Sequence, residues 1–553
     1  MMEHRRRDRL SQSSAADTSI STSEKEDRPR KASGANRIFS WTSILAVLVL
    51  GLAVSQWLRS TPVELPPLIR GKDNTVLFLA HAESGQINVQ LATVQALAQA
   101  HPEIDIHIAS FSTAAKHVER ASAFALAKTS SGRGIKFHEL PGPDRSAAIM
   151  RRLGCDGRSV DDCISHRPGA AGIASLVSQL EVAVISWNGT EHYAIYQEVI
   201  RLVDEIDPAV VVLDYLHRPG VDAIRHLNRA HVIITPNALS DVVTFIQDYG
   251  AGLWKYPALG TGFTFPVPWH RIPENLYVNL RFIYSAIFKP LSRDVMSYLR
   301  SKGVKPIELF DLRPDALFIS QTLPEASLPV TNVPANVTAV GALLLDSAPA
   351  AQQDAGLVKW LQKPTVVVNL GSLFTYSEER AITMAAAIGW LLDHTDFQVL
   401  WKMAPHNDFG DAYAAPLQEF VKQERLKISH WLPIDTLGLL EAGNVVAFIH
   451  HGGASSYHEA VVAGVPQVVI PMWEDLYNFA QLAEDLGIGV YACRRTAPAW
   501  TVEDLVDAFG KVVMETEASL KMRETAHRIG VISRKRPGRE VAAELIAEMV
   551  VPQ

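Results

Sequence analysis

The stretch that most constrains the fold runs from Trp431 to Gly489, because it alternates short apolar runs with helical patterns. Two of these runs, 445–449 and 467–470, are typical of buried strands, and each ends in a loop rich in Gly, Pro or His. A helical pattern follows each loop, which is the order of a parallel sheet with crossover helices. Because ligands of such sheets gather at the carboxyl ends of the strands, the sequence predicts a ligand site in these loops.

The first of these loops combines glycines with polar side chains. It consists of His450-His451-Gly452-Gly453-Ala454-Ser455-Ser456, and Glu459 follows three residues later. Glycines let a bound group approach the backbone, and the start of the next helix offers unpaired N–H groups to an anion. A lone His after a strand is usually only packed, but the glycine pair and the helix start favour an anion site. The set suits a diphosphate attached to a sugar.

The segment resembles the donor-binding signature of family 1 UDP-glycosyltransferases. The matching positions are Trp431, His451, Gly453, Ser456, Glu459, Gly464-Val465-Pro466, Pro471 and Asp475. A weaker resemblance extends from Thr75 to the C-terminus, and the chain is identified as a member of the membrane-anchored, fungal type. The resemblance implies an α/β fold of the GT-B architecture, in which two Rossmann-like domains face each other, and a UDP-sugar as donor.

The resemblance also implies roles for the donor-side residues. Trp431 would stack on the uracil, His451 would hydrogen-bond the diphosphate, and Glu459 would accept the ribose hydroxyls. Further phosphate contacts would come from Gly453, Ser455, Ser456 and Ser372, the last in a Gly-Ser turn after the apolar run 365–370. Trp473 and Asp475 would bind the transferred sugar. Leu476 stands where the family has Gln, and because it cannot hydrogen-bond, the identity of the sugar stays open.

The acceptor side departs from the family pattern. The family carries Gly-His-x-Asn-Pro after its first strand, with that His as general base, whereas this chain has Gly85-Gln86-Ile87-Asn88-Val89. An amide cannot take a proton near neutral pH, so Gln86 is no base. The family's supporting carboxylate is matched by Asp214. Either His81 is the base with Asp214 orienting it, or Gln86 positions the acceptor and another group removes the proton.

Net charge, motifs and cysteine count limit which partners, cofactors and disulfides are expected. The net charge of -7 gives no basic footprint, so nucleic acid is not an expected partner. No Asp-x-Asp follows a predicted strand; the resemblance therefore implies neither a metal nor another cofactor, with His451 and the helix dipole stabilising the diphosphate instead. Three cysteines rule out a disulfide framework, while Cys155 and Cys163 either bridge one loop or stay free thiols.

The N-terminal part is organised differently from the rest. Residues 1–37 are polar and basic and predict a disordered tail. Residues 38–58 carry no charge and are long enough to span a bilayer; a cleaved signal peptide is the main alternative. Lys and Arg precede this segment, which favours a cytosolic N-terminus and a luminal catalytic part, in the endoplasmic reticulum or another endomembrane. The proline-rich residues 59–73 predict an extended linker.

Two domains are expected after the linker. Residues 74–345 would hold the acceptor, with strands at 75–80, 105–110, 209–213 and 232–235. Helices are expected from an Asn88 cap to Ala100 and over 190–206. Residues 254–273 show neither the helical nor the strand periodicity of apolar residues, and they are expected to form a lid, a pocket wall or a surface-packed loop. Residues 346–553 would bind UDP-sugar, with further strands at 398–402 and 426–430 and a helical tail over 521–549.

These features together predict a membrane-anchored enzyme. It would transfer a hexose from a UDP-sugar to a hydroxyl of a lipophilic small molecule, such as a secondary metabolite, sterol or lipid, with inversion at the anomeric carbon. A non-catalytic UDP-sugar-binding membrane subunit is one alternative and would explain Gln86 directly. A nucleotide-sugar epimerase or hydrolase of the same fold is the other.

Overall fold

The computed structural model describes residues 66–129, 132–306 and 315–551, which belong to one compact unit. The predicted tail, the predicted span at 38–58 and residues 59–65 of the linker lie outside the described residues. Among the helices of the described ranges, none has the length and apolarity needed to cross a bilayer.

The first half of the chain builds a sheet of seven parallel strands. Residues 76–79 are fully buried because helices cover both faces, which explains why the strand is a continuous apolar run. The strands in spatial order are β3 (Lys136–Glu139), β2 (Asp105–Ser110), β1 (Lys72–Leu79), β4 (Pro208–Leu213), β5 (His231–Thr235), β6 (Leu317–Ser320) and β7 (Val337–Ala339).

The second half builds a separate sheet of six parallel strands. The strands in spatial order are β10 (Leu426–Ser429), β9 (Gln398–Lys402), β8 (Thr365–Asn369), β11 (Val445–His450), β12 (Gln467–Val469) and β13 (Gly489–Tyr491). The strands predicted in both halves are confirmed within three residues, and both sheets are wholly parallel as expected.

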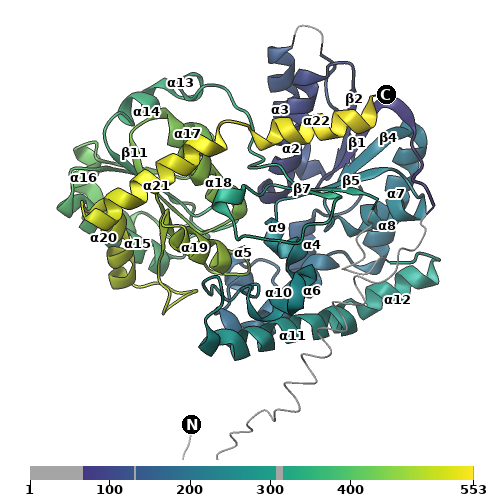
Figure 1. Ribbon diagram of the computed structural model, residues 1–553. Helices are drawn as coiled ribbons and strands as arrows, with labels where there is room; N and C mark the ends of the chain where they lie inside the picture. The colour runs from purple at the N-terminus through teal and green to yellow at the C-terminus, as the bar shows by residue number, and fades with distance from the viewer. Residues whose placement is uncertain (1–65, 130–131, 307–314, 552–553) are drawn as a thin grey trace, which may run out of the picture. The chain divides into compact units, whose positions relative to one another are not determined.

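Helices connect the strands of both sheets (Figure 1). Those of the first half are α2 (Ser84–Ala100), α3 (Ala115–Lys128), α4 (Arg145–Arg152), α5 (Val160–Ile164), α6 (Ile173–Val184), α7 (Gly189–Ile206), α8 (Arg218–His226), α9 (Leu239–Val243), α10 (Ala251–Trp254), α11 (Ile272–Phe288) and α12 (Arg293–Ser301). Those of the second half are α13 (Ala350–Gln353), α14 (Ala355–Trp360), α15 (Glu378–His394), α16 (Gln418–Lys422), α17 (Thr436–Ala442), α18 (Ala454–Ala463), α19 (Leu476–Asp485), α20 (Val502–Val513), α21 (Glu517–Ser533) and α22 (Gly538–Val550).

The first helix starts earlier than the sequence predicted. The backbone N–H groups of Gln86 and Ile87 both donate to the Glu83 carbonyl, so the chain is already helical at Gln86. The expected cap at Asn88 is therefore wrong, and Glu83 holds the N-cap position. By contrast, α7 begins where expected, because Asn188 and Glu191 form a reciprocal capping box.

The C-terminal tail divides between the two halves. Helix α21 packs on α18, whereas α22 crosses to the first sheet and packs on α2 (Figure 1). Ala542, Ile546 and Val550 are fully buried in one cluster with Val76 and Phe78 of β1. The sequence placed this helix with residues 346–553 in the second domain; the structure instead uses its apolar side to cover the first sheet.

A disulfide closes a loop that touches the second half of the chain. Cys155 and Cys163, whose state the sequence left open, are bridged, and Cys493 is a buried free thiol. Inside the loop, buried Asp161 pairs with Arg380 of α15 at 2.5 Å. The loop therefore fixes part of the contact between the two sheets' helical layers.

Candidate functional site

The loop after β11 is held in place by His450. Its side chain is fully buried; Nδ1 accepts from the Gly452 N–H at 3.1 Å, and Nε2 lies 2.9 Å from Gln467 Oε1. Because Nδ1 accepts, the proton sits on Nε2 and is donated to the amide. Gly452 has φ +98°, and an added Cβ would come within 2.9 Å of Val469 and 3.0 Å of the Leu476 carbonyl. Only glycine fits here, which fixes the backbone directly after His451.

The His451 ring lies between two glycines. A Cβ on Gly371 would meet Cε1 of the ring at 2.5 Å, and a Cβ on Gly453 would meet Nε2 at 2.6 Å. Both glycines are thus needed to leave room for the imidazole. Trp473 is 6% exposed, and its ring centroid lies 5.9 Å from that of His451, so the indole packs beside the imidazole. Its predicted contact with the sugar stays a prediction.

The His451 imidazole is neutral, and one of its ring nitrogens is free to form a hydrogen bond. Burial first, and then His450 and Lys402, lower its pKa to about 3. Its Nδ1 is buried without a hydrogen-bond partner. Helix α18 starts at Ala454 with no side-chain cap at its N-terminus, so N–H groups of its first turn also lack a capping acceptor. Ser456 is buried and Ser455 half-buried in that turn. An anion is the ligand that this arrangement suits.

Lys402 adds a positive charge that the sequence analysis missed. Its Nζ donates to the Gly371 carbonyl at 2.7 Å and lies 4.0 Å from the centroid of the Trp431 ring. Burial lowers the pKa of Lys402 to about 8. Trp431 is 64% exposed, so its ring is available for stacking. The sequence signal for this residue was a lysine at the end of the buried strand β9.

Two acidic residues predicted from the motif also lie in this half. Glu459 is half-buried on α18, and burial, followed by Asp435, raises its pKa to about 8. Asp475 is half-buried at the N-cap of α19, and burial raises its pKa to about 6. Ser372, by contrast, is exposed in the turn after β8. The structure thus brings His451, Gly453 and Ser456 to one helix start, with Glu459 one turn further along it.

Leu476 is part of the hydrophobic core. It is 2% exposed and packs in the cluster that includes Met472 and Val468. A glutamine here would place an amide among apolar side chains instead of against a ligand.

We expect Leu476→Gln to lower the free energy of unfolding by about 2–3 kcal/mol, because the buried amide would lack partners. Chemical denaturation measures this loss. Leu520→Gln is the control: Leu520 is 52% exposed on α21, and its replacement should change stability by less than about 0.5 kcal/mol. Equal stability of Leu476→Gln and the unmodified protein would contradict the buried orientation.

Asp214 lies at the end of β4 with one free carboxylate oxygen. Oδ1 accepts from the Leu216 N–H at 2.7 Å, while Oδ2 is buried without a partner. Burial raises the pKa of Asp214 to about 7; the Leu216 hydrogen bond and the positive charge of Arg145 oppose the shift. A carboxylate of this kind takes up a proton readily near neutral pH.

His81 does not form the expected pair with Asp214. It is fully buried, and both its ring nitrogens lack a hydrogen-bond partner. Its ring instead lies among aromatic rings, with centroids 5.1 Å from His217 and 6.2 Å from Trp187. Burial, followed by Arg145 and His217, lowers the pKa of His81 well below its usual range. The hypothesis that Asp214 orients His81 by a hydrogen bond is therefore wrong for this structure.

Gln86 and Arg145 complete the acceptor side. Gln86 is half-buried in the first turn of α2, and its Oε1 has no partner. Arg145 begins α4, is 8% exposed and donates to the Ala183 carbonyl at 2.9 Å. Its charge acts on His81, Asp214 and, from the other half of the chain, Glu474. No sequence motif marked Arg145, because it comes from a polar segment without a family pattern.

The two halves approach each other near Asp475. Partial loss of hydration and the nearby Asp475 carboxylate raise the pKa of Asp241 on α9. The Glu474 backbone N–H donates to His166 Nε2 at 2.9 Å, and the Tyr477 hydroxyl donates to the His166 carbonyl. Residues from the first sheet's loops therefore meet the start of α19.

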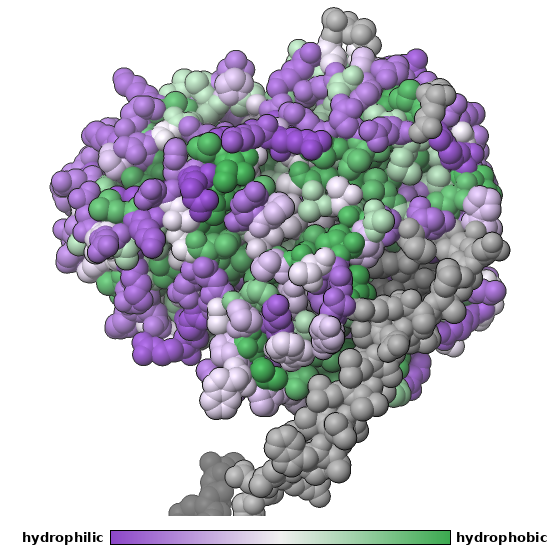
Figure 2. Space-filling model, viewed as in Figure 1, coloured by the Kyte–Doolittle hydropathy of each residue, from purple (hydrophilic) through white to green (hydrophobic). Residues whose placement is uncertain are grey.

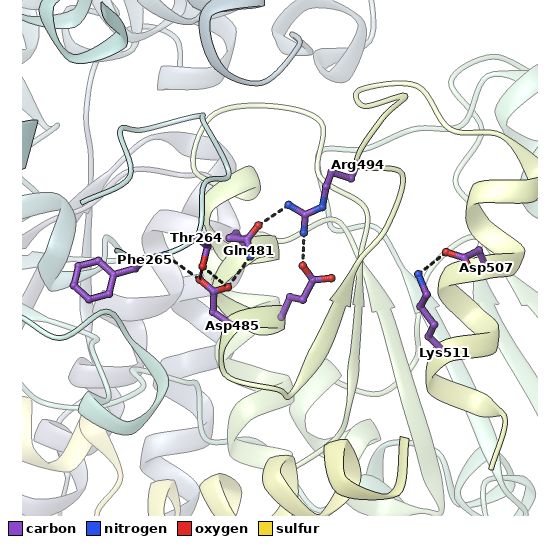
Figure 3. A network of polar contacts seen from close by, with 8 residues as sticks. Thr264, Phe265, Gln481, Asp485, Arg494, Asp507 and Lys511 are labelled. Carbon is purple, nitrogen blue, oxygen red and sulfur yellow. Dashed lines mark hydrogen bonds and ion pairs between the residues drawn. The ribbon is translucent and has the colours of Figure 1, made fainter. Parts of the chain in front are cut away.

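Residues 255–271 of the predicted loop pack on α19, as a pocket wall or surface loop would, whereas residues 254 and 272–273 belong to helices α10 and α11. Asn478 Oδ1 accepts from the Gly260 N–H at 3.0 Å. The Thr264 hydroxyl donates to Asp485, which also accepts from Gln481 (Figure 3). Arg494 joins this network through Gln481 and Glu484. The contacts hold the loop against the helix that begins at Asp475.

Metal ligands do not gather in the described part of the chain. Among its residues, no group of three or more His, Cys, Asp and Glu is placed to hold a metal ion. The expectation that the reaction uses no metal stays a prediction.

Comparisons with known proteins agree with this geometry. Residues 421–549 match the family model of the erythromycin biosynthesis protein CIII-like C-terminal domain. The chain is 32% identical over 515 residues to glycosyltransferase sdnJ of Sordaria araneosa, covering 86% of this chain and 98% of that protein. It is 29% identical over 214 residues to 2-hydroxyacylsphingosine 1-beta-galactosyltransferase of Rattus norvegicus, which spans 37% of this chain and 34% of that protein.

Solved structures share the fold. A UDP-glucosyltransferase from Polygonum tinctorium that glucosylates indoxyl superposes with a TM-score of 0.55 at 16% identity, covering 88% of this chain and all of that one. The calicheamicin glycosyltransferase CalG4 superposes with a TM-score of 0.55 at 16% identity, covering 86% and 98%. The two-domain α/β architecture is therefore that of GT-B-like glycosyltransferases.

Proposed function

This chain belongs to the family 1 UDP-glycosyltransferase-like glycosyltransferases, and we propose that it transfers a hexose from a UDP-sugar to a hydroxyl of a lipophilic small molecule with inversion. The observation that carries the proposal is the His451 ring between Gly371 and Gly453, with an unpartnered Nδ1 beside an uncapped helix start. That arrangement suits a diphosphate. A secondary metabolite is the favoured acceptor, and a sterol or lipid fits the same chemistry.

Each donor-side residue has a proposed task. Trp431 stacks on the uracil and Glu459 binds the ribose hydroxyls. His451, Ser372, Ser455, Ser456 and the backbone at Gly453 bind the diphosphate and stabilise its charge as it leaves. Asp475 and Trp473 bind the hexose. Lys402, next to Trp431 and the Gly371 carbonyl, adds positive charge to the same side.

On the acceptor side, Asp214 is the proposed base. Its Oδ2 takes the proton of the acceptor hydroxyl, whose oxygen attacks the anomeric carbon from the face opposite UDP. The bond between that carbon and the β-phosphate oxygen breaks, and its electron pair leaves with UDP. The Gln86 amide orients the hydroxyl. The two candidates for the base, Asp214 and His81, both have buried atoms without partners, but the raised pKa of Asp214 favours the carboxylate.

The pH dependence of transfer follows from this assignment. A base works only when deprotonated, so kcat/KM should fall as the pH drops through about 7, the pKa to which burial raises Asp214. A pH profile of initial rates measures the inflection. Asp241→Asn is the control and should keep it, because the inflection belongs to Asp214. The rates are measured between about pH 5 and pH 9 in steps of about one unit. A kcat/KM that does not change over this range would contradict Asp214 as the base.

The proposal extends to the membrane. Residues 38–58 anchor the protein by a single span, with the basic N-terminal tail in the cytosol and the catalytic part in the lumen of the endoplasmic reticulum or another endomembrane. A lipophilic acceptor concentrates in that bilayer, next to the enzyme.

A transfer assay tests the proposed function. The full-length protein is given UDP-sugars together with lipophilic alcohols, and UDP release and product mass are recorded. A product heavier than the alcohol by one hexose residue supports transfer, and the UDP-sugar that yields this product names the sugar. Sugar release or isomerisation without any acceptor would instead indicate a hydrolase or epimerase.

A further inference from the structure

Helix α11 buries Asn275 and Asn279 beside Val278 and leaves several large apolar side chains exposed. Asn275 Nδ2 donates to the carbonyls of Leu253 at 3.0 Å and Tyr256 at 2.8 Å. Asn275 Oδ1 accepts from the Ala258 N–H at 2.7 Å. Asn275 therefore binds the backbone that leads into the loop 254–273.

The outward side carries large apolar and aromatic side chains. They share one side of the helix and its C-terminal extension, with exposed fractions of 42% for Tyr277, 55% for Tyr284, 67% for Ile287, 53% for Phe288 and 46% for Leu291. Figure 2 shows green and pale side chains at the lower edge, where Figure 1 places α11. A surface helix normally turns such large apolar side chains toward the core, so this exposed face calls for an apolar partner.

Positive charge accompanies the face. Residues 271–305 contain seven Lys and Arg against two Asp and Glu, although the whole chain has a net charge of -7. Arg293 and Arg300 of α12, and Lys305 after that helix, are exposed. An apolar helix side next to basic residues is the pattern of a helix that lies in the interface of a bilayer, where basic side chains contact the lipid phosphates.

The described chain begins close in sequence to the predicted span. Asn228 Nδ2 donates to the Pro67 carbonyl at 2.8 Å, so the chain is tied down from Pro67 onward. Residues 59–66 reach about 26 Å when extended, at roughly 3.3 Å per residue. The uncharged segment 38–58 precedes them. A span in that segment would keep the catalytic part close to the membrane surface.

We propose that the outer side of α11, formed by Tyr277, Tyr284, Ile287, Phe288 and Leu291, docks on the surface of a lipid bilayer. The helix is followed by the basic residues that contact lipid headgroups and preceded by the loop that packs on α19. Docking would therefore bring the loop that packs on α19 near the bilayer. The benefit of this docking for lipophilic acceptors rests on the proposed function. Binding to the membrane can be tested by itself, because it does not require sugar transfer.

The test separates this face from the predicted span. Leu45→Arg, Leu48→Arg and Leu52→Arg in the full-length chain remove the apolar segment's ability to span a bilayer. In this background, co-sedimentation is measured with vesicles of phosphatidylcholine alone or mixed with phosphatidylserine. Ile287→Asp with Phe288→Asp is compared with Ile382→Asp and Leu520→Asp, which replace side chains exposed to 50% and 52% on α15 and α21.

We expect the span-disrupted protein to bind the anionic vesicles, with binding weakened by salt. The α11 pair should reduce the affinity by at least about tenfold, whereas the control pair should leave it unchanged. Thermal unfolding and UDP binding verify that each variant is folded. Equal binding of the two pairs, or no vesicle binding in this background, would overturn the proposal. A dimer that the α11 pair dissociates, without a difference on vesicles, would assign the face to a second copy instead.

Discussion

Replacing His451 by Ala is expected to reduce kcat/KM for the UDP-sugar by about 10²–10³-fold. The imidazole is placed to donate to the diphosphate, and removing one donor to a developing negative charge has an effect of this size. Its Nδ1 is buried without a partner in the described protein, so the ring's position serves no internal hydrogen bond through that atom. Initial rates at varied UDP-sugar concentration measure the loss.

Two glycine substitutions test the position of the His451 ring, the second of them as a control. Gly371→Ala should cause a comparable loss, because the new methyl would meet the His451 ring at 2.5 Å and displace it. Gly438→Ala lies in the same half of the chain, and its methyl would meet Ile434 at an ordinary 3.6 Å. It should leave the rate unchanged. Full activity of either His451→Ala or Gly371→Ala would refute the diphosphate role of the loop.

Asp214→Asn is expected to lower kcat by about 10²–10⁴-fold while UDP affinity stays the same, since the amide cannot take the acceptor proton. Rates with acceptor, together with a separate UDP titration, distinguish chemistry from donor binding. Asp207→Asn changes a carboxylate at the opposite end of the same strand and should have little effect on kcat. The result that contradicts Asp214 as base is a large loss in His81→Gln with activity retained in Asp214→Asn.

Much of the fold was predictable because its strands are buried on both faces. A short continuous apolar run such as 209–213, bounded by polar residues and turns, is typical of a central parallel strand, and these strands are confirmed within three residues. β3 was missed because it is an edge strand with the polar sequence KFHE and no fully buried residue. The crossing of α22 was missed because its apolar periodicity fits either sheet, and only the packing on Val76 and Phe78 decides between them.

The donor side was predictable for a different reason from the acceptor side. His451, Gly453, Ser456 and Glu459 lie within nine residues of one another, so one local pattern identifies them. The acceptor side combines His81, Arg145 and Asp214, which the fold gathers from distant segments. Local spacing holds no information about such an assembly. Local spacing also could not show that Leu476 points into the core. At the start of a helix, the sequence does not indicate which residues face the core and which face a ligand.

We propose that the Gly371–His451–α18 arrangement binds the diphosphate of a uridine nucleotide. Calorimetric titration of the full-length protein with UDP, uridine and GDP tests it most directly. We expect UDP to bind and uridine to bind at least about tenfold more weakly, because uridine lacks the diphosphate. We expect His451→Ala to remove this difference in affinity. Equal affinity for UDP and uridine, or tighter binding of GDP than of UDP, would contradict the proposal.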